Sequence, residues 1–106
     1  MGASKTQLFS DKQNEIALYA KVLGHPARVA ILQYLYELNA CMCKDMVEEI
    51  GLSQPTISQH LQELKKAGLI QGTIEGKQLC YCIEPRALEY MKTVMQGFLD
   101  SLKMDE

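Results

Sequence analysis

Four cysteines stand in two Cys-x-Cys units, Cys41-Met-Cys43 and Cys80-Tyr-Cys82, and they are the residues best suited to chemistry in this chain. Grouped thiolates are soft ligands that suit trivalent arsenic or antimony, Cd(II), Pb(II), Cu(I) or Zn(II). Paired thiols also suit a redox switch that forms a disulfide or a persulfide. A third interpretation is structural, because a free cysteine packs as a small hydrophobic residue. The chain lacks a secretory context, which argues against a permanent disulfide framework.

A second polar group lies in residues 53–69, at Gln54, Thr56, Ser58 and Gln59. Amide and hydroxyl groups both donate and accept hydrogen bonds, as the mixed edges of bases in a DNA major groove require. Each of these four side chains is a candidate for a base contact or for a phosphate contact, which would carry no sequence information.

The segment that holds them has the start and stop signals of one helix. Ser53 is a suitable N-cap, and Pro55 falls in the first turn, where a missing N–H costs little. Gly68 can adopt the left-handed conformation that ends a helix, with Leu69 packed back on Leu64. The apolar positions form one stripe: Ile57, Leu61 and Leu64.

The flanking segments complete a winged helix. Residues 43–49 predict a short helix, and Gly51-Leu52 a tight turn, so that residues 43–67 form a helix-turn-helix. Residues 69–75 and 78–83 predict two strands joined at Glu75-Gly-Lys77, because Leu79, Tyr81 and Ile83 alternate with other residues. The fold class is therefore mainly α with a small β-hairpin wing.

The remaining chain predicts a loose N-terminal arm (1–10) and a single winged helix-turn-helix domain (11–106). Helices are expected over residues 11–23, 26 to about 38, and about 85–102. The last one carries a long apolar edge: Leu88, Met91, Met95, Phe98, Leu99 and Leu102. We expect this helix and the first to pair with their copies in a two-fold homodimer, which would present two recognition helices to an inverted repeat in double-stranded DNA.

Four stretches in order resemble one known family: Leu23-Gly-His-Pro-Ala-Arg-Val-Ala-Ile-Leu32, Ser53-Gln-Pro-Thr-Ile-Ser-Gln-His-Leu61, Leu64-Lys-Lys-Ala-Gly-Leu-Ile70 and Gly76-Lys-Gln-Leu-Cys-Tyr81. Over residues 18–99 the chain is similar to the ArsR/SmtB family of dimeric winged-helix metalloregulatory transcriptional repressors. The resemblance implies a repressor that binds DNA without a cofactor, and the lack of a membrane-spanning run or signal-peptide core predicts that it is cytoplasmic. An effector such as As(III), Sb(III) or Cd(II) would then release it.

The resemblance also assigns roles to single residues. His60 would contact DNA or act as a structural hydrogen bonder, and Lys77 would reach phosphate or the minor groove. Arg28 would have a structural or phosphate-directed role.

The same resemblance makes Cys41, Cys43, Cys80 and Cys82 the candidate metal ligands, with arsenite the leading effector. In a winged helix the segment before the first of the two helices can lie beside the second wing strand, which would bring the two pairs together. The chain departs from the family pattern by one residue here, so that Cys41 and Cys43 fall at positions usually filled by inward apolar residues. A His and carboxylate site on the last helix is absent from the sequence.

Composition limits the alternatives. The net charge of −2 over 106 residues argues against DNA binding by charge alone, so we expect sequence-specific, salt-sensitive binding. No apolar run has membrane-spanning length, and the start of the chain lacks the core of a signal peptide. An enzyme is disfavoured because neither histidine lies in a nucleophile signature. A winged-helix protein-interaction module remains the alternative outside DNA binding.

Overall fold

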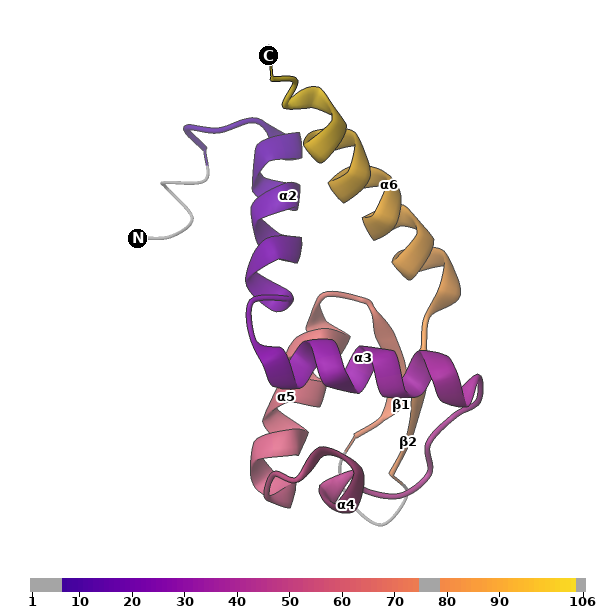
Figure 1. Ribbon diagram of the computed structural model, residues 1–106. Helices are drawn as coiled ribbons and strands as arrows, with labels where there is room; N and C mark the ends of the chain where they lie inside the picture. Colours follow the sequence, from indigo (N-terminus) through magenta and orange to yellow (C-terminus); the bar gives the residue numbers. More distant parts are fainter. Residues whose placement is uncertain (1–6, 75–78, 105–106) are drawn as a thin grey trace.

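The computed structural model describes residues 7–74 and 79–104 (Figure 1). The elements in order are α2 (Asp11–Val22), α3 (Pro26–Leu38), α4 (Val47–Ile50), α5 (Gln54–Lys66), β1 (Ile70–Thr73), β2 (Cys80–Ile83) and α6 (Pro85–Ser101). This order confirms the expected mainly helical winged helix-turn-helix.

The first two helices begin at well-defined caps. The Ser10 side chain accepts a hydrogen bond from the Gln13 backbone N–H, and the Gln13 side chain accepts one from the Ser10 backbone N–H. These two N–H groups at the start of α2 have no partner within the helix, and the reciprocal pair satisfies both. His25 caps α3 by accepting from the Ala27 N–H at 3.1 Å, and Pro26 follows in the first turn. These caps turn the chain sharply between α2 and α3.

The helix-turn-helix differs from its predicted form at two points. The first helix does not begin at Cys43 but at Val47, where the Asp45 carboxylate accepts from the Val47 N–H at 3.1 Å. Ser53 holds the N-cap position of α5 without capping the backbone, because its hydroxyl donates to Thr56 Oγ1 instead.

The stop of α5 follows the prediction. The Leu69 N–H donates to the Leu64 carbonyl at 3.0 Å and the Gly68 N–H to the Lys65 carbonyl at 2.8 Å. With Gly68 at φ +82, this is the paired pattern of a Schellman motif. It directs the chain from α5 straight into β1.

The wing is an antiparallel pair in which Ile70 faces Ile83 and Thr73 faces Cys80. A single bridge between Met42 and Tyr81 adds the segment before α4 to the other edge of β2. Gly72 lies opposite Tyr81 at φ +121, and a Cβ there would collide with the Cys80 carbonyl oxygen. The strands therefore approach closely where only glycine fits.

One core joins the helix-turn-helix to the hairpin. Its fully buried side chains include Ile31, Leu35, Met46, Ile57, Leu61, Leu64, Leu69, Ile70, Ile74 and Tyr81. α2 and α6 lie side by side at the other end of the molecule (Figure 1). They are tied by the Tyr90 hydroxyl, which donates to the Glu15 carboxylate, and by edge contact between the Tyr19 and Tyr90 rings.

Candidate functional site

The two Cys-x-Cys units lie side by side, as the winged-helix interpretation predicts. Met42 and Tyr81 exchange both backbone hydrogen bonds, at 2.7 and 3.0 Å, and both side chains point into the core. Their neighbours therefore face each other at non-hydrogen-bonded positions, where side chains come closest. Cys41 is opposite Cys82, and Cys43 is opposite Cys80. We call these four residues the cysteine ribbon.

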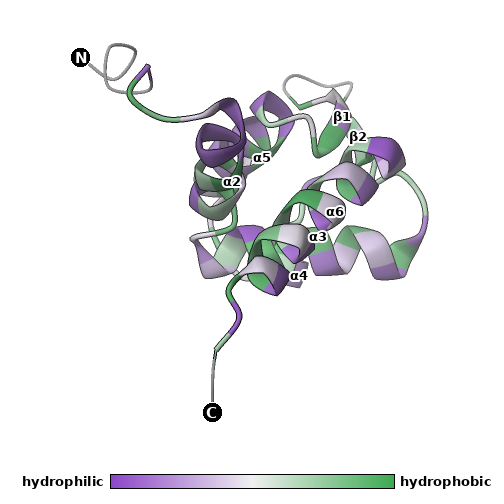
Figure 2. Cartoon of the chain, turned by 90° about the horizontal axis from the view of Figure 1, so that it is seen from above, coloured by the Kyte–Doolittle hydropathy of each residue, from purple (hydrophilic) through white to green (hydrophobic). Residues whose placement is uncertain are grey.

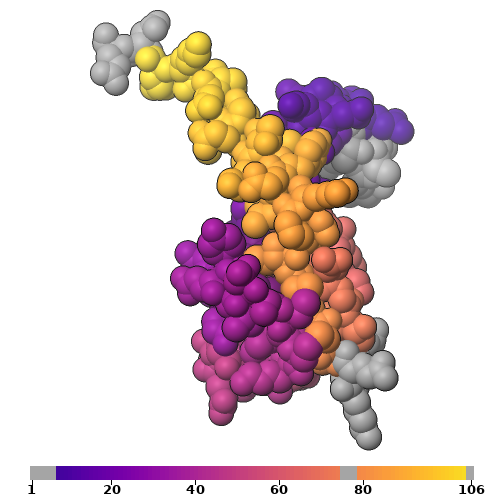
Figure 3. Space-filling model, turned by 90° about the vertical axis from the view of Figure 1, so that its right-hand side faces the viewer, coloured from indigo at the N-terminus to yellow at the C-terminus, as the bar shows by residue number. Residues whose placement is uncertain are grey.

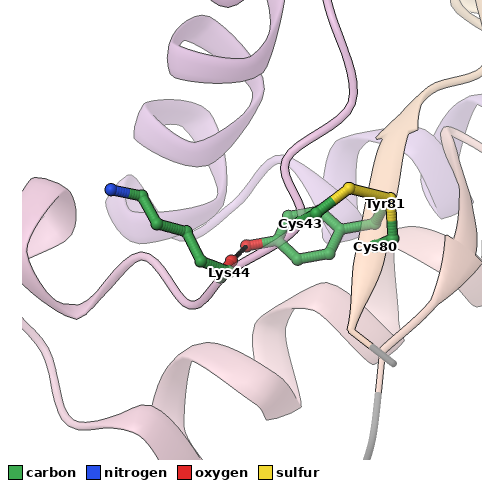
Figure 4. Close-up of a disulfide and its surroundings, with 4 residues drawn as sticks. All are labelled: Cys43, Lys44, Cys80 and Tyr81. Atoms are coloured by element: carbon green, nitrogen blue, oxygen red, sulfur yellow. Dashed lines mark hydrogen bonds between the residues drawn. A yellow bond between two sulfur atoms is a disulfide. The ribbon is translucent and has the colours of Figure 1, made fainter. Parts of the chain in front are cut away.

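The two pairs of the cysteine ribbon are in different states. Cys43 and Cys80 form a disulfide, with Cα atoms 3.9 Å apart (Figure 4). Cys41 and Cys82 are free thiols. A hydrogen bond to Cys41, together with burial, raises the pKa of the Cys82 thiol to about 11. Cys82 therefore keeps its proton at neutral pH.

The ribbon faces outward, which corrects the expectation that Cys41 and Cys43 point inward. Met42 between them is 4% exposed, whereas Cys41 and Cys43 are exposed and Cys80 and Cys82 half-buried. Alternation on a strand explains the result, because pairing with Tyr81 sends Met42 to the core and both cysteines to the other face. The structural interpretation is weakened, since none of the four is a core residue.

Among residues 7–74 and 79–104, no three His, Cys, Asp or Glu side chains gather where they could hold a metal ion. The ribbon presents two facing pairs instead. The sulfur groups that the ribbon offers are therefore two free thiols, at Cys41 and Cys82, and one disulfide, between Cys43 and Cys80.

The buried Tyr81 connects the cysteine ribbon to the helix-turn-helix, a contact that sequence analysis missed. Its hydroxyl donates to the Lys44 carbonyl at 3.1 Å (Figure 4). Burial, with smaller effects of Asp45 and Glu49, raises the pKa of Tyr81 to about 12, so the hydroxyl remains a donor. The next residue, Asp45, accepts a hydrogen bond from the N–H of Val47, the first residue of α4. Cys43 therefore adjoins Lys44, whose carbonyl accepts the hydrogen bond from Tyr81.

The candidate DNA-contacting residues divide into two groups. Gln54, Thr56 and Gln59 are exposed and Ser58 is half-buried on the side of α5 away from the core. That side borders a shallow polar depression together with Gln62, Glu63 and Lys66. Its groups are hydrogen-bonding rather than apolar, as a surface that reads base edges requires.

His60, by contrast, is on the inner side of α5 and 7% exposed. Arg28 Nε donates to His60 Nδ1 at 3.1 Å, and Arg28 Nη1 donates to the Val22 carbonyl at 3.3 Å. The His25 ring lies 4.3 Å from the His60 ring, centroid to centroid. This geometry favours the structural alternative for both His60 and Arg28. Lys77 lies outside the described residues.

The candidate dimer surface follows α2 and α6. Large apolar side chains remain exposed on these helices or beside them: Leu8, Phe9, Leu18, Leu99, Leu102 and Met104. Figure 2 shows hydrophobic and hydrophilic residues alternating along α6. A groove between the two helices is lined by Ile16, Ala17, Gly97 and Phe98.

Comparison with known proteins identifies the family. The pattern of bacterial regulatory proteins of the arsR family matches residues 25–71, which include α3 to α5. An uncharacterized HTH-type transcriptional regulator of Methanocaldococcus jannaschii is 38% identical over 86 residues, which cover 79% of this chain and 96% of that protein.

Two further relatives match over a shorter region. The HTH-type transcriptional repressor SmtB of Mycobacterium tuberculosis is 32% identical over 67% of this chain and 52% of its own length. The arsenic resistance transcriptional regulator ArsR1 of Pseudomonas putida is 30% identical over 61% of this chain and 50% of its own length. The chain thus spans about half the length of these two proteins. No solved structure matches it.

The described residues contain no helix that is both long and apolar enough to span a bilayer. The matched family consists of DNA-binding transcriptional regulators and not of enzymes. Together with the winged helix-turn-helix and the polar outer side of α5, the comparisons show that this chain belongs to the arsR family of transcriptional regulators.

Proposed function

We propose that this regulator is a cytoplasmic repressor, that it binds an inverted-repeat operator as a homodimer, and that thiol chemistry at the cysteine ribbon releases it. The observation that carries the proposal is the position of the ribbon, one residue from the Tyr81–Lys44 hydrogen bond at the start of the helix-turn-helix. An effector that changes the spacing of Cys43 and Cys80 would act where the segment before α4 pairs with the second wing strand.

DNA binding is assigned to Gln54, Thr56, Ser58 and Gln59 on α5, together with Lys77, which lies outside the described residues. Two-fold pairing through α2 and α6 would place two copies of α5 in successive major grooves. The hydrogen-bonding outer side of α5 supports DNA rather than a protein partner.

The effector is a thiol-binding agent, and two chemistries have support. The first is a soft metal or metalloid, with As(III) foremost because the chain resembles an arsenic resistance regulator and offers soft ligands. Inorganic arsenite takes three thiolates, so its binding would require reduction of the Cys43–Cys80 bond first.

The second chemistry is a reversible disulfide, supported by the bond between Cys43 and Cys80. In the reduced protein, these two thiols would give two electrons and two protons to an oxidant as the sulfurs join. Reduction by a cellular dithiol would reverse the step.

The test begins with selection of binding sites from random-sequence duplex DNA, because the operator is unknown. We expect an inverted repeat, bound by wild type with strong salt dependence. The double variant Gln54→Ala/Gln59→Ala should lose at least about tenfold in affinity, since bidentate base contacts each contribute a few kcal/mol at most. Gln33→Ala, an exposed glutamine on α3, is the matched control and should bind as wild type does. Unchanged binding by the double variant would refute the assignment of α5 as the reading helix.

The effector is then tested on the selected DNA. Reduced protein is titrated with arsenite, Cd(II) or the thiol oxidant diamide, and DNA binding is followed by fluorescence anisotropy. Release by diamide that is lost in Cys43→Ser would establish the disulfide switch. Release by arsenite under reducing conditions that is lost on removal of either pair would establish the metalloid site. Undiminished DNA binding in all three titrations would reject control by the thiols.

A further inference from the structure

A pocket of about 440 Å³ lies where the end of α3, strand β2 and the start of α6 meet. Figure 3 looks onto the side of the molecule where α6 begins beside the end of α3. Much of the pocket wall is apolar: Leu35, Tyr36, Ala40, Ile83, Pro85 and Leu88. The volume falls within the range of small-molecule sites, and the wall favours a ligand with a hydrocarbon body, because burial of apolar surface is favourable.

The charged group at the pocket is an acid. Glu89 on α6 contributes a carboxylate to the lining, whereas Asn39 and Gln71 contribute uncharged amides. No lysine or arginine of the described chain lines the pocket. Lys92 reaches Glu89 from the next turn of α6, with 3.3 Å between Nζ and Oε2, but both side chains are more than half exposed, so water weakens this ion pair.

The helix ends at the pocket add to its negative character. Tyr36 and Asn39 line it at the C-terminal end of α3, where a helix carries a partial negative charge, and no basic residue in the last turn offsets that charge. The N-terminal end of α6 also borders the pocket, through Pro85. Its partial positive charge is offset by the Glu84 carboxylate, which accepts from the Arg86 N–H at 3.1 Å.

The geometry points to a small organic cation with an apolar body, such as an arylalkyl amine, as a ligand of this pocket. Its ammonium group is attracted to the Glu89 carboxylate and to the aromatic ring of Tyr36. Its hydrocarbon part packs on Ile83 and Leu88. The same charges disfavour an organic anion of equal size.

Binding of this kind is non-covalent and separable from the proposed function. Cys41 and Cys82 also border the pocket, but both keep their S–H bonds when the cation binds. The cation needs neither DNA nor a reactive thiol. Cation binding by a protein that recognises no operator would therefore reject the repressor and leave the pocket assignment standing, and the reverse result would do the opposite.

The experiment titrates the full chain with three probes that share a phenylethyl body but differ in charge at neutral pH. These are phenethylamine, which is cationic, phenethyl alcohol, which is neutral, and phenylpropionate, which is anionic. Backbone amide signals in two-dimensional NMR report both the site and the affinity. The amine should shift the signals of Ala40, Ile83 and Leu88 and bind at least about fivefold more tightly than the alcohol, with the anion weakest. Equal affinities of amine and alcohol, or shifts confined to other residues, would overturn the inference.

Two surface variants test the role of charge. Glu89→Gln should weaken amine binding by about threefold or more and leave the alcohol unchanged, because only the cation uses the carboxylate. Lys92→Gln should strengthen amine binding, since it removes an ammonium group that competes for Glu89. Glu48→Gln, at an exposed glutamate on α4, is the matched control and should bind as wild type does. Unchanged amine affinity in both Glu89→Gln and Lys92→Gln would contradict the inference.

The aromatic wall and the thiols are tested by two further variants. Tyr36→Leu removes the ring but keeps apolar bulk at a side chain that is 70% exposed, and it should weaken amine binding by about two- to fivefold. The double variant Cys41→Ser/Cys82→Ser should bind the amine as wild type does. Loss of amine binding in the cysteine variant, with its fold intact by circular dichroism, would show that the thiols hold the ligand and would refute a site built from charge and apolar surface.

Discussion

At the residue scale, the hydrogen bond from Arg28 to His60 is a polar side-chain contact between α3 and α5, in addition to their shared apolar core. Nδ1 of His60 must be unprotonated to accept from Arg28 Nε. Burial, and then the neighbouring His25 and Arg28, lower the pKa of His60, with Glu63 opposing them. The charged imidazolium is therefore disfavoured in the folded protein, and His60 serves as a positioning residue for α5, the proposed recognition helix.

This lowered pKa has a consequence for stability. In the unfolded chain His60 titrates near 6.5, above its folded value, so acid protonates the unfolded state first. The contribution of His60 to the free energy of unfolding is full above pH 6.5 and is lost as the pH falls through the folded pKa. Urea unfolding at pH 7.5 and 5.5 should show a larger loss for wild type than for His60→Gln, which keeps an acceptor but does not titrate. An equal loss in both proteins would exclude His60 as a source of acid sensitivity.

At the scale of elements, local signals predicted much of the fold. Pro26 and Leu38 bound α3 as expected, because a proline in the first turn and a left-handed Asn39 are local devices. The Schellman stop at Gly68 is equally local. The orientation of the cysteine ribbon, by contrast, could not be predicted from local sequence signals. Which face Cys41 presents depends on Met42 pairing with Tyr81, 39 residues away, and sequence spacing alone does not specify that register.

The buried role of His60 escaped sequence analysis for a similar reason. Its position next to Leu61 on α5 did not show whether its side chain points to the core or to solvent. The contact that holds it inward comes from Arg28, on a different helix. The pocket beside Cys41 is likewise assembled from α3, β2 and α6. Sites built from three elements are visible only after the elements have packed.

The wing contains a position where backbone geometry and packing both demand glycine. Gly72 has φ +121, and a Cβ would lie 2.8 Å from the Tyr81 Cα. Gly72→Ala should therefore lower the free energy of unfolding by about 1–3 kcal/mol and weaken DNA binding through a displaced hairpin. The matched control is Gly97→Ala on α6, where a Cβ meets nothing within 4 Å and helix propensity should give a small gain. Urea denaturation at one protein concentration measures both variants, and a harmless Gly72→Ala would show that the strands can separate at no cost.

At the scale of the whole molecule, DNA binding must be reconciled with a net charge of −2. The lysines of α5 are exposed, yet Lys66 lies 3.6 Å from Glu63 and Lys65 donates to the Gly72 carbonyl. A single copy therefore presents few unengaged cations along its reading helix. Pairing of two copies would double the phosphate contacts, and we propose that a dimer supplies the affinity that one copy lacks.

The last prediction concerns the proposed dimer. Leu99 in the last turn of α6 and Leu102 just after the helix are 56% and 57% exposed, which is unfavourable for a monomer in water. The double variant Leu99→Gln/Leu102→Gln should be monomeric in sedimentation velocity at concentrations where wild type is dimeric. Its operator affinity should fall by on the order of 100-fold, because two half-sites no longer bind as one unit. Tyr36→Ser, which removes an even more exposed aromatic side chain from α3, should change neither property. A variant that stays dimeric would place the interface elsewhere, and a monomer with full affinity would mean that one reading helix suffices.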